Sequence, residues 1–282
     1  MSHEEVIIGK HKFKIHSILK SNLDILKREN KKDWDFKIII SGDGMTRIGK
    51  TTLAGQIGLY LDADMVEQNW CYDGSLLRTM GVSIGKGKCM IYDEAKSGLD
   101  SKRAMQKYSQ NIVDYFNECG YLNQFLIIIL PDFFDLNKSV ALNLSVFLLN
   151  VTTNDEMQRG YFDFYSRRNK RILYIKGKKF YQYERSLRNF SGTFTIYFPF
   201  DYKELEKIKQ KMILKDSNEK LGKLETRYKA RLERAVVYLY YVEHWKQDKI
   251  GMLFSSDNDQ ITQDKISKII GKSANYKYNY DL

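Results

Sequence analysis

A glycine-rich stretch near the start of the chain has residue types and spacing suited to binding phosphate. It reads GMTRIGKT (44–51), a glycine, four further residues and then Gly-Lys-Thr. Glycine permits the backbone angles of a tight loop, whose N–H groups can then point at one anion. Lys50 would reach the terminal phosphates of a nucleotide, and the Thr51 hydroxyl would ligate Mg²⁺. The stretch therefore predicts a site for a nucleoside triphosphate and its metal.

The loop residues expected to contact the nucleotide form one continuous set. They are Gly44, Met45, Thr46, Arg47, Ile48, Gly49, Lys50, Thr51 and Thr52. A helix that starts near Gly49 would add its positive N-terminal end. Arg47 could act within its own subunit as a charge that stabilises the γ-phosphate. The alternative interpretation is a glycine-rich turn between a strand and a helix, without a ligand.

Two carboxylates follow a short apolar run further along the chain. The run KCMIYDEA (88–95) ends in Asp93 and Glu94. Asp93 would hold Mg²⁺, and Glu94 suits a general base that polarises an attacking water. Two solvated carboxylates at a strand end are the alternative. Together with the loop, the pair predicts hydrolysis of ATP with Mg²⁺, and it argues against a small-molecule kinase, since such kinases generally lack this glutamate.

The elements that must position these residues alternate between strands and helices. The run FKIIIS before the loop predicts a strand buried on both faces, and helical spacing follows the loop. Further buried strands are expected at 124–130 and 145–151, with a helix over 101–119. This alternation predicts an α/β fold with a mainly parallel sheet.

The regions before and after this alternation have other hydrophobic patterns. Residues 1–35 predict a hairpin and a helix that pack on a domain formed by 36–205. Residues 160–184 favour antiparallel hairpins, and 192–200 favours one more strand. Residues 206–282 predict a helical C-terminal region. There, QDKISKIIGKS could begin a helix-turn-helix with Gly271 at the turn, although core packing or oligomer contact is preferred for the helices before it.

The charge of the chain favours an anionic partner. The net charge is +11, and residues 167–188 contain nine basic residues and one acid, Glu184. The aromatic residues interleaved with them are Tyr174, Phe180, Tyr181 and Tyr183. Basic and aromatic side chains together suit phosphate contact and base stacking, so the segment predicts sequence-tolerant binding of nucleic acid. A solvated hairpin that carries lysines is the alternative.

Several classes of protein are not expected from this composition. No apolar run reaches the roughly 20 residues that span a bilayer, and the first thirty residues lack a signal-peptide pattern. A cytoplasmic location is expected, in a host cell if the protein is viral. Cys71, Cys89 and Cys119 lack metal-ligand spacing and predict reduced, partly buried thiols. With four scattered histidines, a zinc site is not expected.

The two motifs and the strand FLIIILPD resemble a known family over residues 36–200. They look like the P-loop ATPases that have an additional strand and a catalytic glutamate, with Walker A and Walker B motifs. Within that group the chain is similar to RecA-like DNA translocases of the FtsK/HerA and zonula-occludens-toxin-like type and to viral DNA-packaging ATPases. The resemblance implies a RecA-like core, a homo-oligomeric ring, double-stranded DNA as a partner, and a viral portal or other motor partner.

The resemblance also implies that a neighbouring subunit supplies an arginine, whose positive charge stabilises the γ-phosphate. Candidates are Arg159, Arg167 and Arg168, with Arg47 as the candidate within the same subunit. In such relatives a polar residue at the tip of the third strand senses the γ-phosphate. Here the tip reads Leu-Pro-Asp and ends in Asp132, where the usual Gln, Asn, Ser or Thr is missing.

Two other functions remain open for a P-loop ATPase of this kind. One is a switch or loader that regulates a nucleic-acid-processing partner without forming a translocating ring. The other is an ATPase linked to membrane assembly or secretion, which needs no membrane segment of its own.

Overall fold

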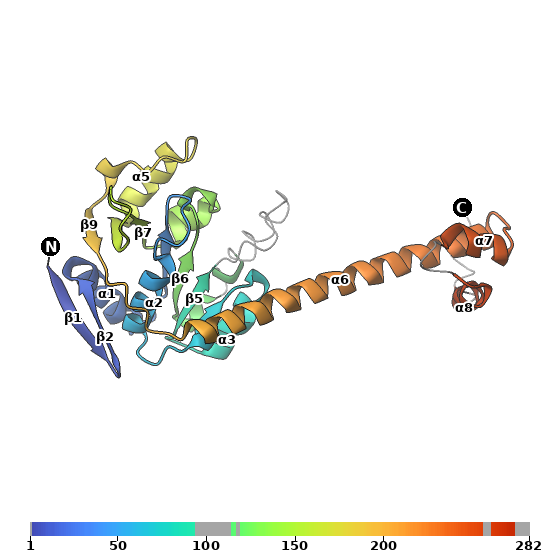
Figure 1. Ribbon diagram of the computed structural model, residues 1–282, viewed down its shortest axis with the longest axis horizontal. Helices are drawn as coiled ribbons and strands as arrows, with labels where there is room; N and C mark the ends of the chain where they lie inside the picture. Colours follow the sequence, from blue (N-terminus) through green and yellow to red (C-terminus); the bar gives the residue numbers. More distant parts are fainter. Residues whose placement is uncertain (1, 94–113, 117–118, 256–260, 274–282) are drawn as a thin grey trace. The chain divides into compact units, whose positions relative to one another are not determined.

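The long helix α6 (Tyr202–Tyr241) connects two compact units, Met1–Ile213 and Leu214–Leu282 (Figure 1). The computed structural model describes residues 2–93, 114–116, 119–255 and 261–273, and it describes only the backbone for residues 119, 213–225 and 273. The helix expected over 101–119 lies almost entirely outside these residues, and so does Glu94.

A seven-stranded sheet lies at the centre of the first unit as described. Its strands, in spatial order, are β4 (Trp70–Cys71), β5 (Cys89–Asp93), β6 (Phe125–Ile129), β3 (Phe36–Ser41), β7 (Phe147–Thr152), β8 (Tyr161–Tyr165) and β9 (Phe190–Thr193). The first five strands are parallel, and β8 and β9 extend the sheet in antiparallel fashion. The predicted α/β class with a mainly parallel sheet is confirmed. The thiols of Cys71 and Cys89 are buried and free, as expected.

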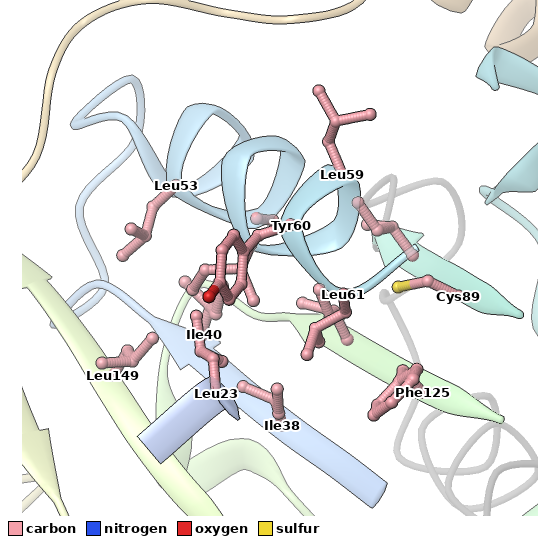
Figure 2. Close-up of a cluster of buried hydrophobic side chains, with 14 of the residues drawn as sticks. Leu23, Ile38, Ile40, Leu53, Leu59, Tyr60, Leu61, Cys89, Phe125 and Leu149 are labelled. Atoms are coloured by element: carbon pink, nitrogen blue, oxygen red, sulfur yellow. The ribbon is translucent and has the colours of Figure 1, made fainter. Parts of the chain in front are cut away.

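Strand β3 is buried along its whole length because it has a neighbour on each side and a packed layer on each face. Ile38 and Ile40 join the hydrophobic cluster beneath helix α2 (Lys50–Leu61) (Figure 2), whereas Ile39 joins the cluster on the opposite face. Helix α2 is apolar nearly all round, and ten of its residues are buried. It is thus a core helix, packed on the sheet after the end of β3.

The remaining elements of the first unit cover the sheet. Strands β1 (His3–Ile8) and β2 (His11–His16) form an antiparallel hairpin, and helix α1 (Ser17–Asn30) follows it. Helix α3 (Leu77–Ile84) contacts β5. The N-terminal residues therefore have the hairpin and helix that their alternation predicts.

The predicted antiparallel hairpin over 167–188 is wrong, because helix α5 (Arg167–Gly177) occupies its first half. The Ser166 side chain caps the helix, accepting a hydrogen bond from Asn169 N–H at 3.5 Å. The buried residues of α5 lie on one helical face and are Lys170, Leu173, Tyr174 and Gly177. Strands β8 and β9 do pair antiparallel, but a helix joins them.

The strand predicted over 192–200 is also mostly wrong, since β9 ends at Thr193. Gln56 of α2 donates hydrogen bonds to the carbonyls of Thr195 and Tyr197 at 2.7 and 2.6 Å. A side-chain amide of the helix thus donates to carbonyls that would otherwise accept from the N–H groups of a neighbouring strand. The aromatic residues of this segment pack against α2 instead of extending the sheet.

The second unit contains the end of α6 and the helices α7 (Gln247–Phe254) and α8 (Gln263–Ser273). Its apolar cluster consists of Val236, Ile250, Ile261, Ile266 and Ile270. Gly271 lies inside α8 and not at a turn, so the helix-turn-helix expected there does not begin at that residue. A second helix after Ser273 would lie outside the described residues. The end of α6 and helix α7 pack into a core, in line with the interpretation preferred from the sequence.

Across the described ranges, no helix combines the length and the apolar character that crossing a bilayer requires.

Candidate nucleotide-binding site

The stretch 42–49 forms a tight loop between the end of β3 and the start of α2. Asp43, Gly44, Arg47 and Gly49 have positive φ angles of 50°, 71°, 58° and 104°. Alternation between left- and right-handed residues turns successive N–H groups toward one side of a loop, which creates a concave anion site. The glycine spacing read from the sequence therefore matches the backbone geometry that the loop adopts.

The N–H groups of the loop fall into two sets. Those of Gly42 and Gly44 donate to the Pro131 carbonyl at 3.2 and 2.9 Å, and that of Met45 donates to the Gly42 carbonyl at 2.8 Å. The N–H groups of residues 46–49 make no hydrogen bond to any residue that the structure describes. They lie directly before the N-terminus of α2, so the helix dipole and these donors together favour an anion here.

Lys50 is the first residue of α2, and its side chain crosses the loop. Its Nζ donates a hydrogen bond to the Met45 carbonyl. Gly42 leaves the room for this arrangement, because a Cβ added there would lie 2.8 Å from Lys50 Nζ and 2.5 Å from Ile48 Cδ1. The ammonium thus lies over the loop, where a bound phosphate would meet it.

Thr51 and Asp93 are brought together although 42 positions separate them in the chain. The Thr51 hydroxyl donates to Asp93 Oδ2 at 3.3 Å. Burial raises the pKa of the Asp93 carboxyl above its usual value, opposed by the charges of Lys209 and Lys50 and by the Thr51 hydrogen bond. A buried carboxylate beside a hydroxyl is a site that a cation stabilises. The two motifs predicted from the sequence meet at one place.

The donor set fits Mg²⁺ better than other metals. Over the residues it describes, the structure has no group of three or more His, Cys, Asp or Glu side chains placed to hold a metal ion. Mg²⁺ needs no such cluster, because it is usually held by one or two protein oxygens together with phosphates and waters. Thr51 and Asp93 can supply those oxygens.

The four candidate arginines do not gather at this site. Arg47 lies in the loop, and Arg159 lies just before β8, whose first residue pairs with Thr152 at the carboxyl end of β7. Arg167 and Arg168 begin α5 at the opposite edge of the sheet, since the last residue of β8 pairs near the amino end of β7. Only Arg47 and Arg159 lie at the edge of the sheet that carries the loop.

Asp132 has a structural role in the position considered for a sensor. Its Oδ1 accepts a hydrogen bond from Phe134 N–H at 2.8 Å and lies 3.3 Å from the Tyr183 hydroxyl. Burial raises the pKa of its carboxyl above the usual value. Asp132 therefore caps the short helix Phe133–Asp135 that follows β6.

Tyr183 is a residue of this region whose position the sequence does not reveal. Its hydroxyl accepts a hydrogen bond from Phe133 N–H at 2.8 Å and lies 3.2 Å from Ser41 Oγ, at the end of β3. The Ser41 hydroxyl donates to Asn150 Oδ1 of β7 at 3.0 Å. Tyr183 thus ties the segment after α5 to the strand that carries the loop, and no pattern around it in the sequence signals this contact.

No protein-family model matches the chain, and neither the curated proteins nor the solved structures include a significant match. The interpretation of the site therefore depends on its own residues and geometry.

Proposed function

We propose that the first unit is an ATP hydrolase with a RecA-like P-loop core. The observation that carries this proposal is the contact between Thr51 and Asp93 across an intervening strand, since β6 lies between β3 and β5. The ATPases that the sequence resembles are named for an additional strand between their two motif strands, and β6 has that position. The order β4-β5-β6-β3-β7 supports the same assignment.

Each side chain has a role that its position supports. The N–H groups of residues 46–49 and Lys50 would bind the β- and γ-phosphates, and Thr51 and Asp93 would hold Mg²⁺. When bound, the metal neutralises charge that develops on the phosphates. Glu94, which follows β5 in the chain and lies outside the described residues, is proposed as the base that polarises water.

The finer proposal is that hydrolysis drives translocation or packaging of DNA by a homo-oligomeric ring. The support is the basic surface of α5 and the loop after it. Its exposed cations are Arg167, Arg168, Arg171, Lys176, Lys179, Arg185 and Arg188. The residues after α5 contact the end of β3 through Tyr183, so a partner bound at that end of the surface would lie close to the nucleotide site.

Turnover of ATP in the presence of Mg²⁺ tests the proposed activity. We expect hydrolysis that double-stranded DNA stimulates, and we expect Glu94→Gln to lower kcat about 100-fold by removing the base. Mass measurement with ATP should give several copies of the chain. Turnover unchanged in Glu94→Gln would contradict the base assignment, and a monomer indifferent to DNA would favour a switch or loader.

Removal of charge from α5 tests the DNA surface. Arg168, Arg171 and Lys179 changed to Gln should weaken DNA binding and reduce the slope of log affinity against log salt by about three, because each cation displaces roughly one counterion. The matched control changes Lys10, Lys12 and Lys14 to Gln, which are exposed lysines of the N-terminal hairpin. Equal effects of the two triple variants would mean that the binding is a property of net charge and not of α5.

A further inference from the structure

A cavity of about 340 Å³ opens beside the phosphate loop. Asp43 of the loop, Asn150 and Thr152 of β7, and Asp163 of β8 line one part of it. Residues 180–183 and Arg185, after α5, line the other part. Strands β7 and β8 lie on the opposite side of β3 from β5, so the cavity lies on the side of the loop away from Asp93.

The charges that line the cavity disfavour a phosphate inside it. Asp43 and Asp163 contribute two carboxylates, against the single guanidinium of Arg185. Asp163 is further engaged, because Arg188 Nη1 lies 3.3 Å from its Oδ1 and Ser191 donates to the same oxygen. Asp43 is exposed at the rim and can accept hydrogen bonds from hydroxyl or amino groups. The lining thus suits a neutral ligand that carries donors.

The wall formed by residues 180–183 offers aromatic faces. The rings of Tyr181 and Tyr183 pack on Phe134 with centroids 5.8 and 5.0 Å away, which fixes their orientation. Phe180 is 71% exposed and has no ring partner among the described aromatic residues, although the Lys179 ammonium lies 5.2 Å from its centroid. An exposed phenylalanine at the edge of a cavity provides a face on which a planar ligand can stack.

We propose that this cavity binds the nucleoside part of the nucleotide whose phosphates bind the loop. The inference rests on the proposed function, because it needs a triphosphate at residues 46–51. The base stacks against the aromatic wall, and Asp43 accepts hydrogen bonds from its amino group or from the ribose hydroxyls. A volume of about 340 Å³ lies within the usual range of small-molecule sites, about 300–1,000 Å³.

Phe180 then stacks on the base of the bound nucleotide, a role other than contact with nucleic acid. The phosphates extend from the loop toward Asp93, and the nucleoside extends the opposite way over β7 and β8. The antiparallel pair β7 and β8 then lies beneath the nucleoside, because Asn150 of β7 and Asp163 of β8 line the cavity there.

Calorimetric binding of Mg-ATP and of Mg-tripolyphosphate to the full chain tests this inference. Phe180→Ala should weaken ATP binding about tenfold, from loss of one stacked base, and leave tripolyphosphate binding unchanged. The matched control is Ile175→Ala, which removes another largely exposed apolar side chain, on α5, that does not line the cavity. It should change neither affinity.

The outcomes separate this inference from the function on which it rests. Equal ATP affinity in Phe180→Ala and the unaltered chain overturns the nucleoside site and leaves the hydrolase proposal standing. Equal loss of ATP and tripolyphosphate affinity, or loss of DNA affinity alone, also overturns it. An unaltered chain that binds neither compound overturns both proposals.

Discussion

Replacement of Lys50 by alanine is expected to lower kcat/KM for ATP by about 100- to 1,000-fold, the effect of removing one preorganised donor from a site of developing charge. Lys50 Nζ lies over the loop and donates to the Met45 carbonyl, an acceptor that a phosphate oxygen would replace. Residues 42–49 contain no lysine, so Lys50 is the lysine next to the loop. The loss should appear in binding as well as in turnover, since under the proposed function the ammonium would contact the phosphates before and during the reaction.

Steady-state kinetics and calorimetry of the Lys50→Ala chain provide the measurement. The control is Lys86→Ala, which removes an exposed lysine whose Nζ pairs with Asp33 at 3.0 Å and should leave turnover unchanged. Both variants should show the same thermal unfolding curve as the unaltered chain. ATP bound and hydrolysed at full rate by Lys50→Ala would contradict the assignment of the loop.

Replacement of Lys170 by methionine is expected to flatten the pH dependence of stability above neutral pH. Lys170 is fully buried on α5, and its Nζ donates to the Ala141 carbonyl and to Ser145 Oγ. Burial, with the charges of Arg167 and Arg171, lowers the pKa of its ammonium to about 7. The unfolded chain keeps the ordinary pKa of about 10.4, so between these values it binds more protons than the folded chain does.

The free energy of unfolding should therefore rise from about pH 7 to about pH 10, by at most about 1.4 kcal/mol per pH unit from this group. Below pH 7 both states are protonated and the full cost of the buried charge remains. Denaturant unfolding at several pH values gives the slope. Lys170→Met should have a smaller slope, whereas Lys176→Met, at an exposed position of the same helix, should keep the original one. Equal slopes in all three chains would contradict the shifted pKa.

Much of the fold follows from patterns that only one kind of element satisfies. The three consecutive isoleucines of FKIIIS place apolar side chains on both faces of a strand, so the run is most stable with a packed layer on each face. The error at α5 has a specific cause. Its buried face includes Lys170, which counts as polar in any periodicity, and the aromatic and branched residues around it fit a strand equally well. Only the packing against the sheet decides between the two.

In the candidate site too, some features follow from local sequence and others from contacts between distant segments. The loop and the Asp93 strand are predictable, because the spacing of glycines and the sequence of an apolar run fix local backbone geometry. The position of Tyr183 is not, since it depends on contacts with Asp132 and Ser41, which lie 51 and 142 positions away in the chain. The cavity beside the loop likewise arises from strands and a helix that meet only in the folded chain.

The carbonyl of Pro131, which accepts the N–H groups of Gly42 and Gly44, has a consequence for affinity. It fixes the first half of the loop to the segment just after β6 before any ligand arrives. Ordering one residue of backbone costs about 1–2 kcal/mol. Because Gly42 and Gly44 are already held, an incoming phosphate would have to immobilise only the second half of the loop. The entropy lost on binding would be correspondingly smaller, so under the proposed function a proline carbonyl just after a neighbouring strand would contribute to nucleotide affinity without touching the nucleotide.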